Sequence, residues 1–95
     1  MAKGYWIAQI EVSDPEQFEL YKPLSAAAAE AFGGKYLVRG GDSTCVEGSG
    51  RVRNVIVEFP SYQAALDAYH SPEYTKARGT RKGAADFNLT VVEGT

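Results

Sequence analysis

Arg39 and Glu58 are the two residues whose types and positions best suit the recognition of a small molecule. They lie at the ends of two neighbouring predicted strands, residues 35–39 and 53–59, and simple alternation places both side chains on the face away from the helices. A guanidinium can hold a carboxylate or phosphate through two hydrogen bonds, and a nearby carboxylate can orient a ligand or act as a base. The alternative is an ion pair that sets the register of an interface.

His70, Tyr74 and Arg81 are the other candidates for a site. His70 lies between two predicted helical segments, and an imidazole with a pKa near ~6.5 serves as acid or base at neutral pH. Tyr74 and Arg81 are two turns apart on one helix face, so both can point into one cleft. The alternatives are a capping or packing role for His70, core packing for Tyr74, and a surface position for Arg81. We therefore take Glu58 and His70 as candidate catalytic residues, and Arg39, Tyr74 and Arg81 as candidate ligand-binding residues.

Several other kinds of chemistry find little support in the sequence. No basic residue lies within five positions of Cys45, so we expect a buried or idle thiol. Gly40 and Gly41 follow a strand and do not open a helix, which is wrong for a phosphate loop and predicts a turn or bulge. One histidine and one cysteine provide no metal-ligand set, and the glycines are not placed for nicotinamide or flavin binding. We expect neither a metal nor a cofactor.

The elements that position these residues follow one another without a linker or repeat. Alternation predicts a first strand over residues 5–12, with Trp6, Ala8, Ile10 and Val12 on a covered face. Asp14, Pro15 and Gln17 predict a helix start with a capping box, and this helix extends to about Phe32. Pro23 predicts a kink or a break in that helix.

The remaining elements complete a single α+β domain over residues 1–95. Two strands, a helix in two segments and a last strand are expected; their approximate ranges are 35–39, 53–59, 61–70, 71–82 and 87–92, with a short strand at 44–47. The order is βαββαβ. Two helices cannot cover both faces of a four-stranded sheet, so both lie on one face. The other face carries Ile7, Leu37 and Ile56, and a second copy of the chain is its simplest cover.

Composition and charge narrow the classes of partner. The net charge of −2 does not favour nucleic acid or an anionic membrane, and no apolar run approaches the ~20 residues of a membrane span. The first residues lack the apolar stretch of a signal peptide. We expect a soluble cytoplasmic protein that binds itself and a small anionic or polar molecule, with no nucleic-acid or membrane partner.

Five short segments, in order along the chain, resemble a known family. They are Gly4-Tyr5-Trp6-Ile7-Ala8, Arg39-Gly40-Gly41, Val57-Glu58-Phe59-Pro60-Ser61, Ser71-Pro72-Glu73-Tyr74 and Val92-Glu93-Gly94. Together they resemble the domain of unknown function family 1330, in the dimeric α/β-barrel superfamily. The resemblance implies a ferredoxin-like fold whose sheets pair face to face in a homodimer, and it implies no established reaction. The sequence departs from the family pattern at His70, where asparagine is more typical, and at Pro23, which lies earlier in its helix.

Three functions are compatible with these observations. The first is a homodimeric small-molecule-binding module with a polar cleft between sheet and helices. The second is a cofactor-independent enzyme of the monooxygenase or isomerase type, which the superfamily resemblance suggests. The third is a purely structural dimer. A cavity lined by polar groups favours the first two, and a barrel filled by side chains favours the third.

Overall fold

The computed structural model describes residues 2–95 and has the expected order of elements. The strands and helices are β1 (Gly4–Val12), α1 (Pro15–Ala31), β2 (Lys35–Arg39), β3 (Arg53–Phe59), α2 (Tyr62–His70), α3 (Pro72–Arg81) and β4 (Ala85–Glu93). The last strand is longer than the sequence predicted, because it pairs with β1 along its full length, from Ala85 opposite Val12 to Glu93 opposite Gly4.

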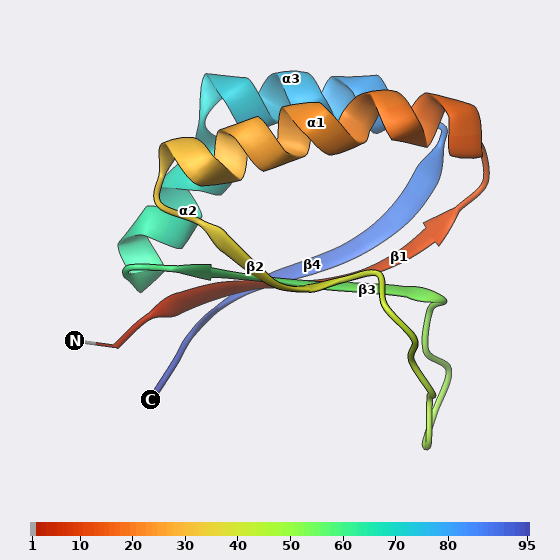
Figure 1. The fold of residues 1–95 in the computed structure, drawn as a ribbon, viewed down its shortest axis with the longest axis horizontal. Helices are drawn as coiled ribbons and strands as arrows, with labels where there is room; N and C mark the ends of the chain where they lie inside the picture. The colour runs from red at the N-terminus through yellow and green to blue at the C-terminus, as the bar shows by residue number, and fades with distance from the viewer. Residues whose placement is uncertain (1) are drawn as a thin grey trace.

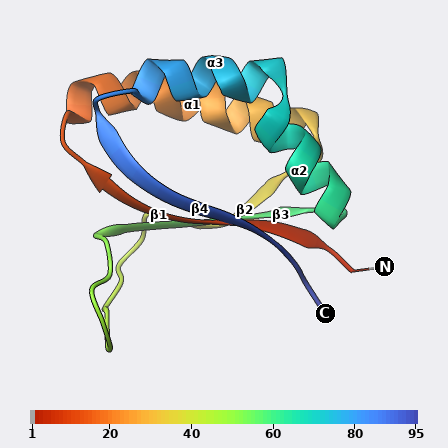
Figure 2. The same ribbon diagram turned by 180° about the vertical axis from the view of Figure 1, so that it is seen from behind.

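The four strands form one antiparallel sheet in the order β2-β3-β1-β4. All three helices lie on one face of this sheet, and the opposite face is uncovered (Figure 1). The view from behind shows the same two layers, with α3 beside α1 above β4 (Figure 2). The predicted α+β fold with one-sided helices is confirmed.

The core lies between the two layers and is rich in aromatic side chains. Trp6 on β1 is buried, donates its indole N–H to the carbonyl of Ala65 at 2.8 Å, and packs against Phe59 and Tyr74 with ring centroids 5.0 and 4.8 Å away. A buried indole nitrogen needs such an acceptor, so this bond fixes α2 against the sheet.

The start of α1 differs from the expected capping box. The Asp14 carboxylate accepts from the backbone N–H of Gln17 at 3.2 Å, as predicted. The Gln17 amide, however, donates to the carbonyls of Thr80 and Lys82 at 2.9 and 3.2 Å, and so joins the beginning of α1 to the end of α3. The helix also continues unbroken through Pro23, because its packing on the core outweighs the hydrogen bond that proline removes.

Residues 41–52 form a projecting loop, which we call the arm. No strand is present at 44–47, where one was expected. Cys45 is exposed, so the first of the two expectations for it, a buried thiol, is wrong, and the second, an idle thiol, stays a prediction. Glycines at 40, 41, 48 and 50 lie in and beside this segment, and glycine disfavours strand structure. The arm extends from the end of the sheet toward its uncovered side (Figures 1 and 2).

A β-bulge in β2 reverses the predicted direction of Arg39. The pairing of β2 with β3 shifts register at Leu37, between Tyr36 and Val38. One extra residue exchanges the faces of the side chains that follow it. Arg39 therefore lies on the helix-covered face, with its guanidinium 4.3 Å from the centre of the Tyr36 ring. The prediction that Arg39 and Glu58 share a face is wrong.

Candidate functional site

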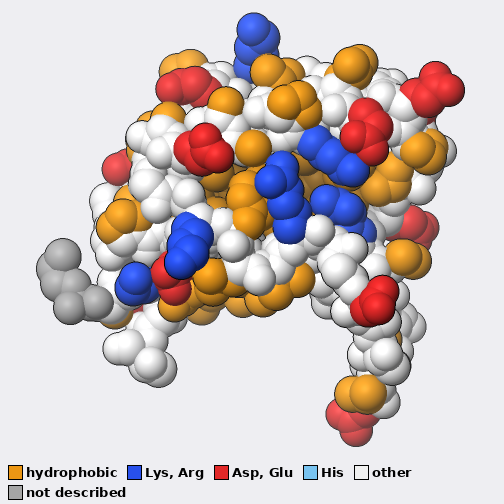
Figure 3. Space-filling model, in the orientation of Figure 1, with side chains coloured by type: hydrophobic (Ala, Val, Ile, Leu, Met, Phe, Trp, Pro, Cys, Tyr) orange, Lys and Arg blue, Asp and Glu red, His pale blue; other side chains and the backbone are white. Residues whose placement is uncertain are grey.

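A cavity lies between the sheet and α1, on the side of the molecule where β2 forms the sheet edge. It is lined by aromatic and aliphatic core residues together with Lys22, Ser25, Arg39 and Arg53. Its volume is about 30 Å³, enough for one or two water molecules, and the hollow reaches about 440 Å³ when its open mouth is included. In Figure 3, several Lys and Arg side chains surround a hollow in which hydrophobic side chains are visible.

Two tyrosine hydroxyls meet at the inner wall of the cavity. Tyr21 on α1 and Tyr74 on α3 are buried, and their hydroxyl oxygens are 2.7 Å apart. Burial raises the pKa of both phenols, and the nearby Arg81 only partly offsets this for Tyr74. Both are therefore neutral at physiological pH. Because one hydrogen bond joins the pair, one hydroxyl hydrogen remains for a further acceptor.

Ser25 and Tyr36 extend this polar wall toward the mouth. The Ser25 hydroxyl is buried, and its oxygen lies 3.5 Å from that of Tyr36, at the outer limit of a hydrogen bond. Ser25 belongs to α1 and Tyr36 to the edge strand β2. These hydroxyls therefore lie between the aromatic side chains of the cavity interior and the cations at its mouth.

Three cations form the mouth. The Lys22 ammonium forms an ion pair with the Glu19 carboxylate at 2.9 Å, whereas Arg39 and Arg53 form no ion pair within residues 2–95. The Arg53 guanidinium lies directly against Gly40, where any Cβ would collide with it, and the positive φ of 71° at that position also favours glycine. Gly40 therefore forms the predicted turn and, because it has no side chain, also leaves room for the Arg53 guanidinium.

No aspartate or glutamate is among the residues that line this cavity. Its polar groups are three cations and four hydroxyls, those of Tyr21, Ser25, Tyr36 and Tyr74. An apolar interior with donors and positive charge suits a molecule that has an apolar body and an anionic or hydrogen-bond-accepting end.

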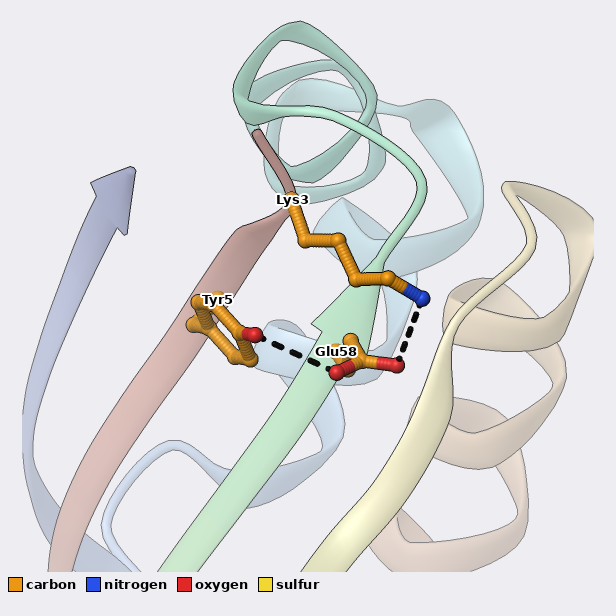
Figure 4. A network of polar contacts seen from close by, with 3 residues as sticks. All are labelled: Lys3, Tyr5 and Glu58. Atoms are coloured by element: carbon orange, nitrogen blue, oxygen red, sulfur yellow. Dashed lines mark hydrogen bonds and ion pairs between the residues drawn. The ribbon is translucent and has the colours of Figure 1, made fainter. Parts of the chain in front are cut away.

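Glu58 lies on the opposite face of the sheet, away from this cavity. Its carboxylate accepts from the Lys3 ammonium and the Tyr5 hydroxyl, both at 3.2 Å (Figure 4). The hydrogen-bonded Lys3 lowers the pKa of Glu58. Partial burial and the bond to Glu58 raise the pKa of Tyr5. These three residues form a small polar network on the uncovered face.

The remaining predicted site residues do not all line this cavity. Tyr74 lines the cavity, but His70 is exposed at the end of α2, beside the Tyr69 ring, and does not line it. Arg81 lies over the Phe87 ring, 3.7 Å from its centre, and lines a separate groove of about 680 Å³ between α3 and β4. Arg39 and Tyr74 are thus brought to one cavity, while Glu58, His70 and Arg81 are not.

Sequence reasoning missed several residues that line the cavity. Tyr21 was not among the predicted site residues, because its hydroxyl partner is distant in sequence. Arg53 lies in β3 opposite Ile10, whose side chain belongs to the covered face. Alternation along β3, which places Arg53 on the same face as the buried Val57 and Phe59, was the available signal for this residue.

Residues 2–95 contain no group of three or more His, Cys, Asp or Glu side chains that could hold a metal ion. None of the helices described is long and apolar enough to cross a membrane.

Comparison with known proteins assigns the family. The model of the domain of unknown function DUF1330 matches residues 3–95. The chain belongs to the DUF1330 family. This confirms the resemblance seen in the sequence, and it covers nearly the whole chain. A comparison with curated proteins found no match.

Solved structures similar to this DUF1330 protein share its fold. A protein of unknown function from Rhodopseudomonas palustris is 20% identical, with a TM-score of 0.77 over 99% of this chain and 83% of its own. The cofactor-independent oxygenase SnoaB from Streptomyces nogalater is 11% identical, with a TM-score of 0.65 over 97% and 92% of the two chains. A dimeric ferredoxin-like protein of unknown function from Thermobifida fusca is 12% identical, with a TM-score of 0.64 over 96% and 90%. These similarities establish the ferredoxin-like architecture of the chain.

Proposed function

We propose that this DUF1330 protein is a homodimeric binding module for a small molecule that carries a carboxylate or similar anionic end on an apolar body. The observation that carries the proposal is the cavity whose mouth has three cations and whose lining has no acidic side chain. Arg39 and Arg53 bind the anionic end, and the aromatic interior takes the apolar body.

The hydroxyl pair gives the cavity a second point of recognition. The hydroxyl hydrogen that the Tyr21–Tyr74 bond leaves over is donated to an oxygen on the far end of the ligand. A site with donors at both ends and an apolar middle selects for length as well as charge.

Ligand entry requires the mouth to widen. A volume of about 30 Å³ is far below the roughly 300 Å³ of a typical ligand pocket. Arg39 rests on Tyr36, and Arg53 lies 5.5 Å from the centre of the Phe18 ring, so both long side chains cover the opening. Their outward rotation opens the cavity, and the ligand's negative charge favours the new positions.

A thermal-shift screen tests this function. Aromatic carboxylates, matched to amides of the same shape, are added to the protein, since a ligand that binds the native state raises its unfolding temperature. We expect carboxylates to stabilise and the amides to do so less. Arg39→Ala and Arg53→Ala each abolish the difference, whereas Arg51→Ala, which removes the same charge outside the cavity lining, retains it. Equal shifts for both ligand series would contradict the proposal.

The dimer is proposed from the uncovered face of the sheet. Ile7, Val38 and Val92 are 42, 38 and 37% exposed, and Ile7 and Val38 both pair with Ile56 across the strands. Such a contiguous apolar strip is characteristic of an interface. The related protein from Thermobifida fusca is described as dimeric. Light scattering tests this: twice the 10.3 kDa of one chain is expected, and 10.3 kDa at micromolar concentration would contradict it.

A second candidate function is cofactor-independent oxygenation in the same cavity. It is favoured by the fold shared with the oxygenase SnoaB and by the buried phenols. Neutral hydroxyls and arginines can stabilise the phenolate that forms when a hydroxylated aromatic substrate loses a proton, before this anion gives electrons to oxygen. Oxygen consumption with hydroxylated aromatic compounds distinguishes the two functions, because a binding module shows a thermal shift with them and consumes no oxygen.

A further inference from the structure

The groove between α3 and β4 lies on the opposite side of the molecule from the mouth of the cavity. The cavity opens beside β2 and the groove follows β4, and these two strands are the edges of the sheet. The view from behind shows α3 above β4 on this side (Figure 2). With about 680 Å³, the groove has the size of a small-molecule site. The two spaces share a wall formed by Phe87 and Leu89, but their cations are different.

Positive charge predominates in the groove. Arg78 and Arg81 belong to the last turn of α3, Lys82 follows it, and all three residues line the groove. The lining also contains Asp86, which forms no ion pair with any of the residues 2–95. Residues three and four positions apart are neighbours on a helix surface, so the three cations lie on one side of the helix end. Three cations and one carboxylate leave this surface with a net positive charge.

Aromatic rings hold the two guanidinium groups in place without neutralising them. The guanidinium carbon of Arg81 lies 3.7 Å from the centre of the Phe87 ring. That of Arg78 lies 4.9 Å from the centre of the Tyr69 ring, and its Nη1 donates to the Tyr69 hydroxyl at 2.8 Å. Neither arginine forms an ion pair within residues 2–95. Their positive charges are therefore held in position and remain available to an anion.

Both arginines also have a hydrogen-bond donor without an acceptor. The Nε atoms of Arg78 and Arg81 are buried and have no hydrogen-bond partner within residues 2–95. In Arg78, the bond to Tyr69 occupies Nη1, which leaves the edge formed by Nε and Nη2. Such an edge donates two parallel hydrogen bonds to a carboxylate or a phosphate. Buried donors without acceptors destabilise a fold, and the oxygen atoms of a bound anion remove this cost.

Gly79, between the two arginines, is a glycine that the fold does not require. It lines the groove, is exposed, and lies inside α3 without a positive φ. A Cβ at this position would meet no atom within 4 Å, so packing does not exclude a side chain. Glycine inside a helix costs stability relative to alanine. Neither the backbone nor the packing explains this glycine, whereas the close approach of a ligand to the helix backbone does.

We propose that this groove is a second binding site, for a small phosphate monoester. Arg78 and Arg81 bind the phosphate group, Lys82 adds a third positive charge, and the absence of a side chain at Gly79 lets the group approach α3. A phosphate monoester carries roughly 1.5 to 2 negative charges and three acceptor oxygens, so it uses two guanidinium groups more fully than a carboxylate does. The organic part lies along β4, over the apolar side chains of the groove. The site does not depend on the proposed function, because none of its cations lines the cavity.

An NMR titration tests the site, because amide signals report separately on the groove and on the cavity. Phenyl phosphate is added to the 15N-labelled protein in a phosphate-free buffer of low ionic strength. Benzoate, which has the same ring and a single negative charge, is titrated for comparison. We expect the signals of residues 78–82 to shift, with a dissociation constant about tenfold lower for phenyl phosphate than for benzoate. Shifts confined to the cavity lining, or equal constants for the two ligands, overturn the proposal.

Substitutions identify the groups that bind the phosphate. Arg78→Gln and Arg81→Gln are each expected to raise the dissociation constant of phenyl phosphate about fivefold or more. The control Lys76→Gln removes the same charge from an exposed position of α3 outside the groove lining, and it changes the constant by less than about twofold. Unchanged affinity in both arginine variants overturns the proposal.

Gly79→Glu keeps the test decisive if the loss of an arginine disturbs the packing on Tyr69 or Phe87. This variant removes no side chain, has room for the new one, and gains helix propensity. Its carboxylate lies among the cations and competes with the phosphate, so we expect the affinity for phenyl phosphate to fall about tenfold. Gly79→Gln, which is equal in size and neutral, weakens binding less. A Gly79→Glu variant that binds phenyl phosphate as tightly as the original protein overturns the proposal.

Discussion

The hydroxyl groups of Tyr21 and Tyr74 are 2.7 Å apart in the buried space between α1 and α3. The two residues are 53 positions apart in the chain, and their rings meet edge to face at 6.3 Å. This contact joins the two long helices above the sheet and also forms the inner wall of the cavity. Stability and the proposed ligand recognition therefore depend on the same pair.

Removing one hydroxyl of the pair lowers stability. Tyr74→Phe leaves the Tyr21 hydroxyl buried without its partner, and we expect a loss of about 1–2 kcal/mol in the free energy of unfolding. Urea denaturation measures it. Tyr21→Phe/Tyr74→Phe loses less than the sum of the two single variants, because neither hydroxyl is then left unpaired. Strict additivity in this cycle would show that the hydroxyls do not interact.

Alkaline pH destabilises the protein through the same pair. Burial raises the pKa of Tyr21 and Tyr74 in the folded state above the value of about 10 in the unfolded chain. Their stabilising contribution is complete below that pH and is lost as the pH rises, since only the unfolded state releases the protons readily. We expect the urea midpoint to fall between about pH 9 and 12, and to fall less in the double phenylalanine variant. If the urea midpoint fell equally steeply with pH in the original protein and in the double phenylalanine variant, this would argue against buried neutral phenols.

Acidic pH acts through Glu58. Lys3 lowers the pKa of this carboxyl in the folded state below its ordinary value of 4.5. The resulting stabilisation is present above that value and is lost as the pH falls through the folded-state pKa. Glu58→Gln removes this pH dependence, and added salt weakens it in the original protein, because the pair is partly exposed. The unfolding temperature, measured at decreasing pH from pH 6, shows this loss of stability. Glu30→Gln, which changes an exposed carboxyl on α1, serves as the control.

The single tryptophan anchors α2 to the sheet. Trp6→Phe removes the bond to the Ala65 carbonyl and leaves a void among Phe59, Tyr69 and Tyr74. We expect a loss of about 2–3 kcal/mol in the free energy of unfolding. Circular dichroism follows the transition, since the fluorescent side chain is gone. Tyr62→Phe, at a position 39% exposed, changes stability little. A Trp6→Phe variant with the same free energy of unfolding as the original protein would show that the indole hydrogen bond contributes nothing to stability.

The sequence by itself determined the order of elements and the covered face of the sheet. Alternation in β1 identified Trp6, Ala8 and Ile10 as buried, and Asp14 marked the start of α1, which the structure confirms. These features depend on local backbone geometry and on periodicity, which neighbouring residues specify.

Only the tertiary structure decided which polar residues meet. Arg39 faces the cavity because of the bulge at Leu37, a one-residue irregularity that alternation along β2 did not reveal. Glu58 is paired with Lys3, and Tyr74 with Tyr21, through contacts between segments more than fifty residues apart. Such contacts follow from how strands register and how helices pack across the whole domain, and a local pattern carries no information about either.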